Sequence, residues 1–406
     1  MTRPPVSVVV VSQGRPRALA RCLTGLSQLN YPTFEIIVVT NHEGHAAAAP
    51  WSGRIKLARF DEENISSARN LGIRQAAGDI VAFIDDDAVP EPTWLDHLCG
   101  VFDSPAVAAG GYVIGRNGIS LQWGARVALS DATSEPLPIE GRDPQLHRGR
   151  AGQAIKTEGT NMAFRRETLL RNGGFDPVFR FYLDETDLNL RLAAQDAVTA
   201  IVPRAVVHHG FDASARRTAA RVPLTLFEIG ASVVAFLRRH AAGGNLDVLV
   251  AAERARQSER LFRHLIDGRL EPRDVRRLMR SFDEGCKAGF GRPLSRPAPI
   301  PDGNARFLHF HCVTPNGHRV LTGRPWQAAR LASEARSLVA LGHRVSVFVL
   351  SPTIRRHRVV FHPDGYWLQS GGLFGASDRS DPAFRYWRFR DRIARERQRV
   401  AEIRDP

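Results

Sequence analysis

The stretch Asp79-Ile80-Val81-Ala82-Phe83-Ile84-Asp85-Asp86-Asp87 decides the class of fold. Its apolar run predicts a buried strand that ends in three consecutive carboxylates. Like charges crowded at the end of a buried strand cost free energy unless a cation lies beside them. A divalent metal with oxygen ligands, itself binding a phosphate, would meet that need. The alternative is a solvated acidic turn in which Asp86 or Asp87 caps a helix that begins near Pro92.

The segments before this stretch favour an α/β domain. Residues 6–11 and 34–39 are continuous apolar runs, typical of strands covered on both faces, and 55–60 predicts a shorter strand. Apolar residues at helical spacing predict helices over 17–29 and 66–77. This alternation predicts a mostly parallel sheet flanked by helices, and such sheets bind ligands at the carboxyl ends of their strands. The three aspartates stand at such an end.

The pattern continues to about residue 210. Six further segments are predicted: strands over 107–114, 160–164 and 200–207 (the last broken by Pro203), helices over 166–171 and 185–194, and a long polar loop over 130–155.

The composition is that of an ordinary globular protein. The chain has 406 residues, enough for two domains or one large domain with an appendage. No apolar run approaches the roughly 20 residues needed to span a bilayer, and the first apolar run is predicted to be a strand, not a signal peptide. Four scattered cysteines show neither metal nor disulfide spacing. We therefore expect a cytoplasmic location.

The positive charge is concentrated in the second half of the chain. Residues 1–210 hold 21 Lys and Arg against 23 Asp and Glu, whereas residues 211–406 hold 35 against 19. The basic half therefore suggests an anionic partner such as lipid headgroups or nucleic acid. No nucleic acid is expected, because no recognisable reading motif is present and the arginines are interspersed with acids.

Residues 213–300 are predicted to be mainly helical and end in a Pro-rich linker, and a small α/β unit follows over 301–406. In that unit, strands over 307–313 and 343–350 flank a helix over 325–341. The tail, residues 381–403, is predicted to be a helix that mixes arginine with aromatic side chains. This helix would lie on the anionic inner face of the plasma membrane, or alternatively pack on its own domain.

Several motifs occur in order along residues 1–212. They are the opening strand Val6 to Val11, Glu35-Ile36-Ile37-Val38-Val39, Ser67-Ala68-Arg69-Asn70-Leu71-Gly72, the acidic stretch with Pro90 and Trp94-Leu95, Gly159-Thr160-Asn161-Met162-Ala163-Phe164-Arg165-Arg166, Gly174-Phe175-Asp176, and Asp184-Glu185-Thr186-Asp187-Leu188-Asn189-Leu190-Arg191-Leu192. Together they resemble the family 2 glycosyltransferases, which have the GT-A fold. The resemblance implies that residues 1–212 form an inverting catalytic domain.

The resemblance implies a nucleotide-sugar donor and a divalent metal, Mg²⁺ or Mn²⁺. Asp85 and Asp87 would hold the metal, which neutralises the charge that grows on the leaving diphosphate. Asp86 would lie nearer the donor ribose or sugar. Arg69 would contact the donor phosphates, or alternatively form a structural ion pair with one of the aspartates. His209 would complete the metal shell, with His208 as the alternative.

The second acidic group supplies the base in this resemblance. Glu185 would take the proton of the acceptor hydroxyl, and direct attack then inverts the anomeric centre. Asp187 is expected to cap its helix or pair within it. The acceptor would be a glycan, a lipid-linked sugar or another hydroxyl compound. Its expected contacts are Thr160, Asn161 and Asp184.

The donor base is the point at which the sequence departs from the family. The carboxylate that usually follows the second strand is replaced by Thr40, and Asn41 offers an amide that could read a pyrimidine edge. Ser12, at the end of the first strand, is a further expected donor contact. Trp94 is expected to pack in the core.

The implied function is metal-assisted transfer of a sugar in polysaccharide or cell-surface glycan synthesis. The alternative is a sugar-nucleotide or carbohydrate-binding protein without turnover. Residues 306–350 resemble the first strand-helix-strand unit of GT-B glycosyltransferases.

Overall fold

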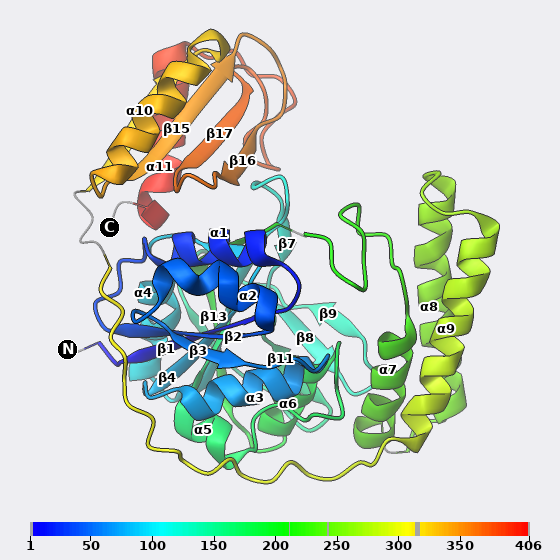
Figure 1. The fold of residues 1–406 in the computed structure, drawn as a ribbon. Helices are drawn as coiled ribbons and strands as arrows, with labels where there is room; N and C mark the ends of the chain where they lie inside the picture. Colours follow the sequence, from blue (N-terminus) through cyan, green and yellow to red (C-terminus); the bar gives the residue numbers. More distant parts are fainter. Residues whose placement is uncertain (1–2, 211, 242, 313–316, 405–406) are drawn as a thin grey trace.

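The computed structural model describes residues 3–210, 212–241, 243–312 and 317–404 of the chain. A ten-stranded sheet with helices on both faces forms its centre (Figure 1). The strands of this sheet are β1 (Val6–Ser12), β2 (Phe34–Thr40), β3 (Lys56–Arg59), β4 (Ile80–Asp85), β5 (Ala88–Pro90), β6 (Ala106–Ile114), β7 (Leu121–Trp123), β10 (Gln145–Arg148), β12 (Met162–Arg165) and β13 (Val198–His209). The main path runs β10-β13-β6-β12-β4-β1-β2-β3.

The predicted α/β architecture with a mostly parallel sheet is confirmed. β1 pairs in parallel with β2 and β4, and the register sets Ser12 beside Thr40 and Val11 beside Asp85. These three strands therefore end at one edge, where polar side chains replace the apolar runs. β12 lies antiparallel between β4 and β6. The short strands β5, β7 and β10 are also antiparallel to their neighbours.

Two apolar cores explain why the central strands are continuous apolar runs. Alternate side chains of β1 enter opposite cores: Val8 packs with α1 and α4, and Val9 with α3, α5 and α6. Trp94 is fully buried in the first core, as expected. The helices of this part are α1 (Pro16–Leu26), α2 (His42–Ala48), α3 (Ile65–Gln75), α4 (Trp94–Cys99), α5 (Arg166–Arg171) and α6 (Asp184–Ala193), with 3-10 turns η1 (Ala49–Trp51) and η2 (Gly100–Asp103).

β13 is longer than predicted and passes through Pro203. Its pairing with β6 shifts register between Val202 and Val206, and this irregularity accommodates a proline that cannot donate to the ladder. Beyond it, β13 pairs with β5, which sets His209 opposite Ala88, the residue after the three aspartates. The strand thus returns to the acidic edge of the sheet.

The segment predicted as a loop over 130–155 contains three short strands. β10 extends the main sheet through β13, while the other two pair with β8 (Arg126–Leu129) in a separate sheet of order β11-β8-β9. They are β9 (Ser134–Pro136) and β11 (Gln153–Lys156).

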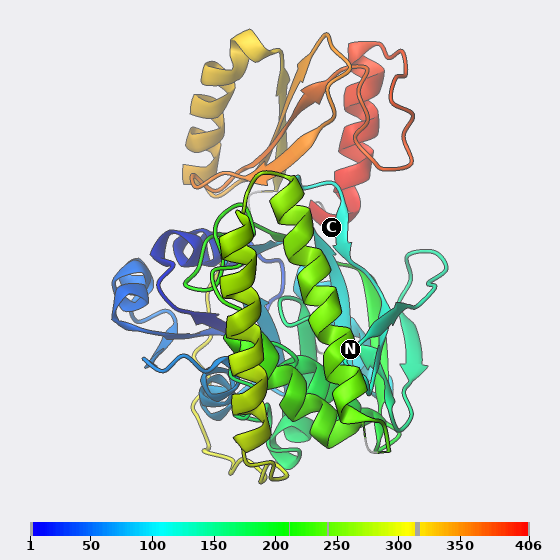
Figure 2. The same cartoon turned by 90° about the vertical axis from the view of Figure 1, so that its right-hand side faces the viewer.

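The helical segment predicted over 213–300 is present. α7 (Phe227–His240), α8 (Leu246–Ile266) and α9 (Pro272–Gly291) pack together beside the sheet (Figures 1 and 2). An extended segment then runs back along the part that contains the ten-stranded sheet (Figure 1). The strand predicted over 307–313 is wrong for the described residues 307–312, which form no strand; Val313 lies outside the described residues. Phe310 instead packs between Phe34 and Trp51.

The C-terminal unit is a four-stranded sheet with two helices. β14 (His318–Gly323), β15 (Arg344–Ser351) and β17 (Trp367–Gly372) are parallel, and β16 (Arg358–Phe361) is antiparallel to β17. The predicted helix after the first strand is η3 (Pro325–Gln327) followed by α10 (Ala328–Ala340). The tail helix, α11 (Phe389–Arg404), begins later than predicted and buries Arg392, Glu396 and Arg404. It packs on its own unit, which is the alternative given above for this tail. The GT-B likeness of residues 306–350 and a membrane contact of this helix remain predictions.

None of the helices in the described ranges is long and apolar enough to span a membrane.

Candidate active site

The first acidic cluster joins the end of β4 to the end of β13. His209 Nε2 lies 3.1 Å from Asp87 Oδ1 and 4.0 Å from Asp85 Oδ2. One ligand atom from each of the three residues falls within 4.8 Å of the others, the spacing of a metal site. His208 points elsewhere, since its Nε2 lies 2.8 Å from Glu91 Oε1. The structure therefore favours His209 over His208.

Positive groups surround Asp87 in this cluster. Arg15 and Arg217 lie 3.0 and 3.1 Å from its Oδ2, which also accepts a hydrogen bond from the Asp212 backbone N–H. Burial by itself raises the pKa of Asp87, but His209 and the two arginines hold it well below its usual range. Asp87 is therefore a carboxylate across the neutral pH range.

Asp86 faces away from the open side of the cluster. It is fully buried, accepts a hydrogen bond from Ser12 Oγ at 2.6 Å and pairs with Arg15. Burial raises its pKa to about 7, against the opposing charge of Arg15. Through these contacts Asp86 links the turn after β4 to the end of β1. In the described residues it does not line the cavity that Asp85 and Asp87 line.

The second acidic cluster opens α6. Tyr182 and Leu183 both have left-handed backbone angles (φ 75° and 65°), which place Asp184 and Glu185 at the helix start. Lys156 on β11 donates to Glu185 Oε1 at 3.0 Å. Burial alone would raise the pKa of Glu185, but the charges of Lys156 and Arg69 lower it to about 2. Glu185 is therefore a carboxylate at neutral pH.

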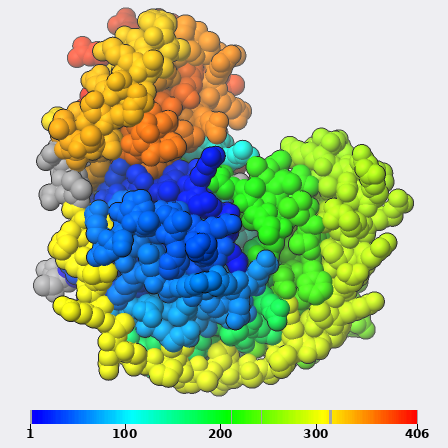
Figure 3. All heavy atoms as spheres, in the orientation of Figure 1, coloured from blue at the N-terminus to red at the C-terminus, as the bar shows by residue number. Residues whose placement is uncertain are grey.

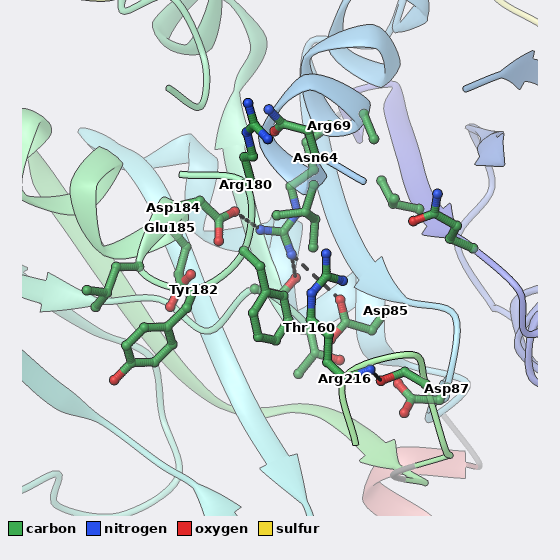
Figure 4. A pocket seen from close by; sticks show the side chains of 18 of the residues that line it. Asn64, Arg69, Asp85, Asp87, Thr160, Arg180, Tyr182, Asp184, Glu185 and Arg216 are labelled. Carbon is green, nitrogen blue, oxygen red and sulfur yellow. Dashed lines mark hydrogen bonds and ion pairs between the residues drawn. The ribbon is translucent and has the colours of Figure 1, made fainter. Parts of the chain in front are cut away.

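Arg69 connects the two clusters. Its guanidinium forms an ion pair with Asp184, lies 3.6 Å from Asp85 Oδ1 and donates to the Gly159 carbonyl at 3.1 Å (Figure 4). The side chain is almost fully buried against the Phe175 ring. Burial raises the pKa of Asp184 to about 7, although Arg69 opposes this shift. One cation thus holds the ends of β4 and α6 together.

Both clusters line a single cavity of about 920 Å³. Its other walls come from the ends of β1 and β2 and from residues 213–217, which follow β13. A cavity of this size accommodates a ligand as large as a nucleotide sugar. The residues predicted from the sequence that line it are Ser12, Asn41, Arg69, Asp85, Asp87, Thr160, Asp184, Glu185 and His209.

Three predicted site residues do not line this cavity. Thr40 is buried beneath α2, where its hydroxyl lies against Gly44. Asp86 is buried as described above. Asn161 is fully buried. Its side-chain oxygen accepts a hydrogen bond from Trp94 Nε1, and its side-chain nitrogen donates to the carbonyls of Tyr112 and Ala205. Its side chain is therefore taken up by structural contacts and does not reach the cavity.

Asp187 is a structural residue, as expected. Its carboxylate binds Arg191, Arg239 and His240 at 2.8 to 2.9 Å, which ties α6 to α7.

The sequence interpretation missed three basic site residues. Arg15 lies in the turn after β1, so the rule that places Asp85 at a strand end could have found it. Lys156, one of three lysines in the chain, ends a strand that begins in the segment predicted as a loop, and it lies one residue beyond that segment. Arg217 lies in the return after β13, where no local pattern points to Asp87.

Residues 4–222 match the family described as "Glycosyltransferase like family 2", and because this covers more than half of the chain, the chain belongs to that family. It is 29% identical over 236 residues to the O-antigen biosynthesis protein RfbC of Myxococcus xanthus. This alignment covers 54% of this chain and 18% of that protein. It is 30% identical over 186 residues to the glucosyl-dolichyl phosphate glucuronosyltransferase of Haloferax volcanii, covering 42% of this chain and 56% of that protein. The chain thus spans less than two thirds of the length of either relative.

Among solved structures, the chain aligns with the mannosyltransferase PcManGT from Pyrobaculum calidifontis in complex with GDP-Man and Mn²⁺. The TM-score is 0.44 and the identity 16%, over 71% of this chain and 88% of that chain.

Proposed function

We propose that this protein transfers a sugar from a nucleotide-diphosphate donor to an acceptor hydroxyl, with inversion at the anomeric carbon. The observation that carries the proposal is that two acidic clusters with different electrostatic environments line one cavity and are connected through Arg69. One cluster suits a cation and a diphosphate, and the other suits proton removal. Membership of the glycosyltransferase family supports this reading.

The residues present fit a divalent metal. Asp85, Asp87 and His209 offer two carboxylates and one imidazole, a donor set compatible with Mg²⁺ or, with the nitrogen ligand, Mn²⁺. When bound, such a metal acts as a Lewis acid toward the leaving diphosphate. Arg15 and Arg217 would add positive charge beside the same phosphates, since both already lie against Asp87.

Glu185 is proposed as the general base. Its carboxylate takes the proton of the acceptor hydroxyl as that oxygen forms a bond to the anomeric carbon. The bond from that carbon to the diphosphate oxygen breaks, and its electron pair leaves with the diphosphate. Attack from the side opposite the leaving group inverts the centre. Lys156 keeps Glu185 ionised and oriented before the acceptor arrives.

Donor and acceptor contacts follow from the cavity walls. Asn41 and Ser12 lie at the ends of β2 and β1, which we assign to the donor side. Asp184, which precedes Glu185, and Thr160 of the same cavity are assigned to the acceptor. The relatives are named for O-antigen biosynthesis and for glucuronosyl transfer to a dolichyl phosphate-linked sugar. We therefore propose a polysaccharide or cell-surface glycan precursor as the acceptor.

A panel of uridine, thymidine and guanosine diphosphate sugars tests the proposal. We expect at least one to release its nucleotide diphosphate in a reaction that a chelator stops. Asp85→Ala and Glu185→Gln should both lose this turnover while keeping the circular dichroism of the native protein. The exposed Glu167→Gln on α5 serves as the matched control and should turn over normally. Turnover that survives in both site variants would overturn the proposal.

A further inference from the structure

The far end of the C-terminal unit exposes apolar side chains on three loops. Since β14, β15 and β17 are parallel, the loops that follow them (residues 324–327, 352–357 and 373–388) start from one edge of the sheet. Each loop carries at least one large apolar side chain that is mostly in solvent. They are Trp326 (77% exposed), Ile354 (62%), Phe384 (59%) and Tyr386 (71%).

Arginines accompany these side chains. Residues 352–358 and 383–390 contain six arginines and no acidic residue. All six are exposed, and none forms an ion pair within the described ranges of the chain. They are Arg355, Arg356, Arg358, Arg385, Arg388 and Arg390.

Asp391, directly after Arg390, is exposed and forms no ion pair in the described residues, so it offsets part of this positive charge. The other acidic residues close in sequence are already engaged. Asp381 pairs with Arg395 of α11, and Asp378 accepts hydrogen bonds from the backbone and hydroxyl of Ser380. Their charge is therefore partly compensated within the unit, whereas the six arginines face solvent.

The loops form one continuous surface. Phe374 N donates to the Thr353 carbonyl at 3.1 Å, which joins the second loop to the third. The Phe374 ring stacks on Tyr386 at 5.8 Å. On the other side, Arg324 lies over the Phe389 ring at 4.4 Å, which brings the first loop to the start of α11. We call this surface, made of the four apolar residues and six arginines above, the arginine–aromatic edge.

Most of this edge lies at the end of the C-terminal unit away from the catalytic domain. Arg358 is the exception, because its neighbour Val359 donates to the Asn117 carbonyl of that domain at 2.9 Å. α11 begins beside the edge and ends at Arg404, which contacts Glu91 of the catalytic domain. A helix of 16 residues is about 24 Å long. The C-terminal unit stands as a separate lobe above the sheet (Figures 1 to 3). The edge is therefore free to meet a large flat partner without obstruction from α7 to α9.

We propose that the arginine–aromatic edge docks the protein on an anionic lipid surface. Tryptophan and tyrosine favour the boundary between headgroups and acyl chains, and arginine places its stem in that boundary with its charge among phosphates. Basic residues near a bilayer gain from its negative surface potential. The same charge density argues against a second copy of the edge as the occupant, because six arginines on each copy would repel. Aliphatic Ile354 also offers no stacking face, unlike a surface dedicated to nucleic-acid bases.

Vesicle sedimentation of the full chain tests this proposal. We expect the protein to sediment with phosphatidylcholine vesicles that contain a third of phosphatidylglycerol, and to be released by high salt. It should stay in solution with pure phosphatidylcholine. Two variants probe the edge: Trp326→Ser with Tyr386→Ser, and Arg355→Gln with Arg385→Gln and Arg388→Gln. Each should lower the partition coefficient by about tenfold or more.

The matched control lies on the same unit but away from the edge. Leu341→Ser with Arg336→Gln removes one exposed apolar residue and one exposed arginine from α10 and its C-terminal end, and should sediment like the native protein. Native sedimentation by both edge variants, or no sedimentation of the native protein, would overturn the proposal. So would retention of the native chain on heparin or RNA without binding to anionic vesicles. Sugar transfer to a water-soluble acceptor should be unchanged in the edge variants, so this test is independent of the proposed activity.

Discussion

Arg404 and Glu91 form a buried bidentate ion pair between the last helix and the loop behind the acidic cluster. The two contacts, Nη2 to Oε1 and Nε to Oε2, measure 2.7 and 2.8 Å. Glu91 Oε1 also lies 2.8 Å from His208 Nε2. Because His208 precedes His209 on β13, the C-terminal unit is attached to the strand that carries a proposed metal ligand.

Removing Arg404 should therefore destabilise the whole chain. Arg404→Ala leaves Glu91 as a buried, uncompensated charge, and we expect the free energy of unfolding to fall by about 3–5 kcal/mol. Arg404→Met combined with Glu91→Leu should recover most of that loss, since no buried charge remains. The exposed Arg397→Ala, on the same helix, is the control. Urea unfolding followed by fluorescence measures all four proteins, and a loss no larger for Arg404→Ala than for the control would contradict the prediction.

The same pair predicts how stability depends on pH. Burial alone would raise the pKa of Glu91, but the charge and hydrogen bonds of Arg404, with His208, lower it from 4.5 to about 2. A carboxyl with a lowered folded-state pKa stabilises the protein above its unfolded pKa, and this stability is lost as pH falls from about 4.5 toward 2. Between about pH 6 and pH 3, Glu91 should account for a loss of about 2 kcal/mol. Glu91→Gln should show a correspondingly smaller fall in unfolding free energy over that range. An identical fall in both proteins would remove Glu91 from this role.

The ends of the central strands could be predicted because their causes are local. Val6 to Val11 and Ile80 to Ile84 are apolar runs buried on both faces, and polar residues appear where the strands leave the core. The choice of His209 over His208 as the proposed metal ligand could not be made that way. It depends on the pairing of β13 with β5, which directs one histidine toward Asp87 and the other toward Glu91.

Contacts between distant segments account for what could not be predicted from the sequence. Asn161 follows a motif residue that lines the cavity, but its amide meets groups from α4, β6 and β13, which no local pattern could indicate. Phe310 lies in a strand-like apolar run, yet its N–H bonds a single carbonyl, that of Phe34, and no ladder forms. Glu91 and Arg404 are 313 residues apart, so neither residue predicts the other.

Lys156 should control the acid limb of the proposed activity. It lies 3.0 Å from Glu185 and, with Arg69, keeps the pKa of that carboxyl near 2 against the effect of burial. In Lys156→Met burial would act with less opposition, so the pKa of Glu185 should rise and the acid limb of kcat/KM should move to higher pH. Lys56→Met removes a lysine outside the cavity and serves as the control. Measuring kcat/KM from acid to neutral pH tests this prediction. If the acid limb of Lys156→Met lies at the same pH as in the native protein, Lys156 does not set the pKa of Glu185.

Arg69 should have two separable roles, which a double variant can distinguish. Arg69→Gln leaves Asp184 buried without its cation, so we expect a lower free energy of unfolding and weaker binding of the nucleotide diphosphate. Adding Asp184→Asn removes the unpaired charge and should restore stability. If Arg69 also contacts donor phosphates, nucleotide affinity should remain about tenfold or more below native, because a charge-assisted hydrogen bond is still missing. Calorimetric titration with the nucleotide diphosphate and Mn²⁺ measures this. Recovery of native affinity together with native stability would assign Arg69 to the structural ion pair alone.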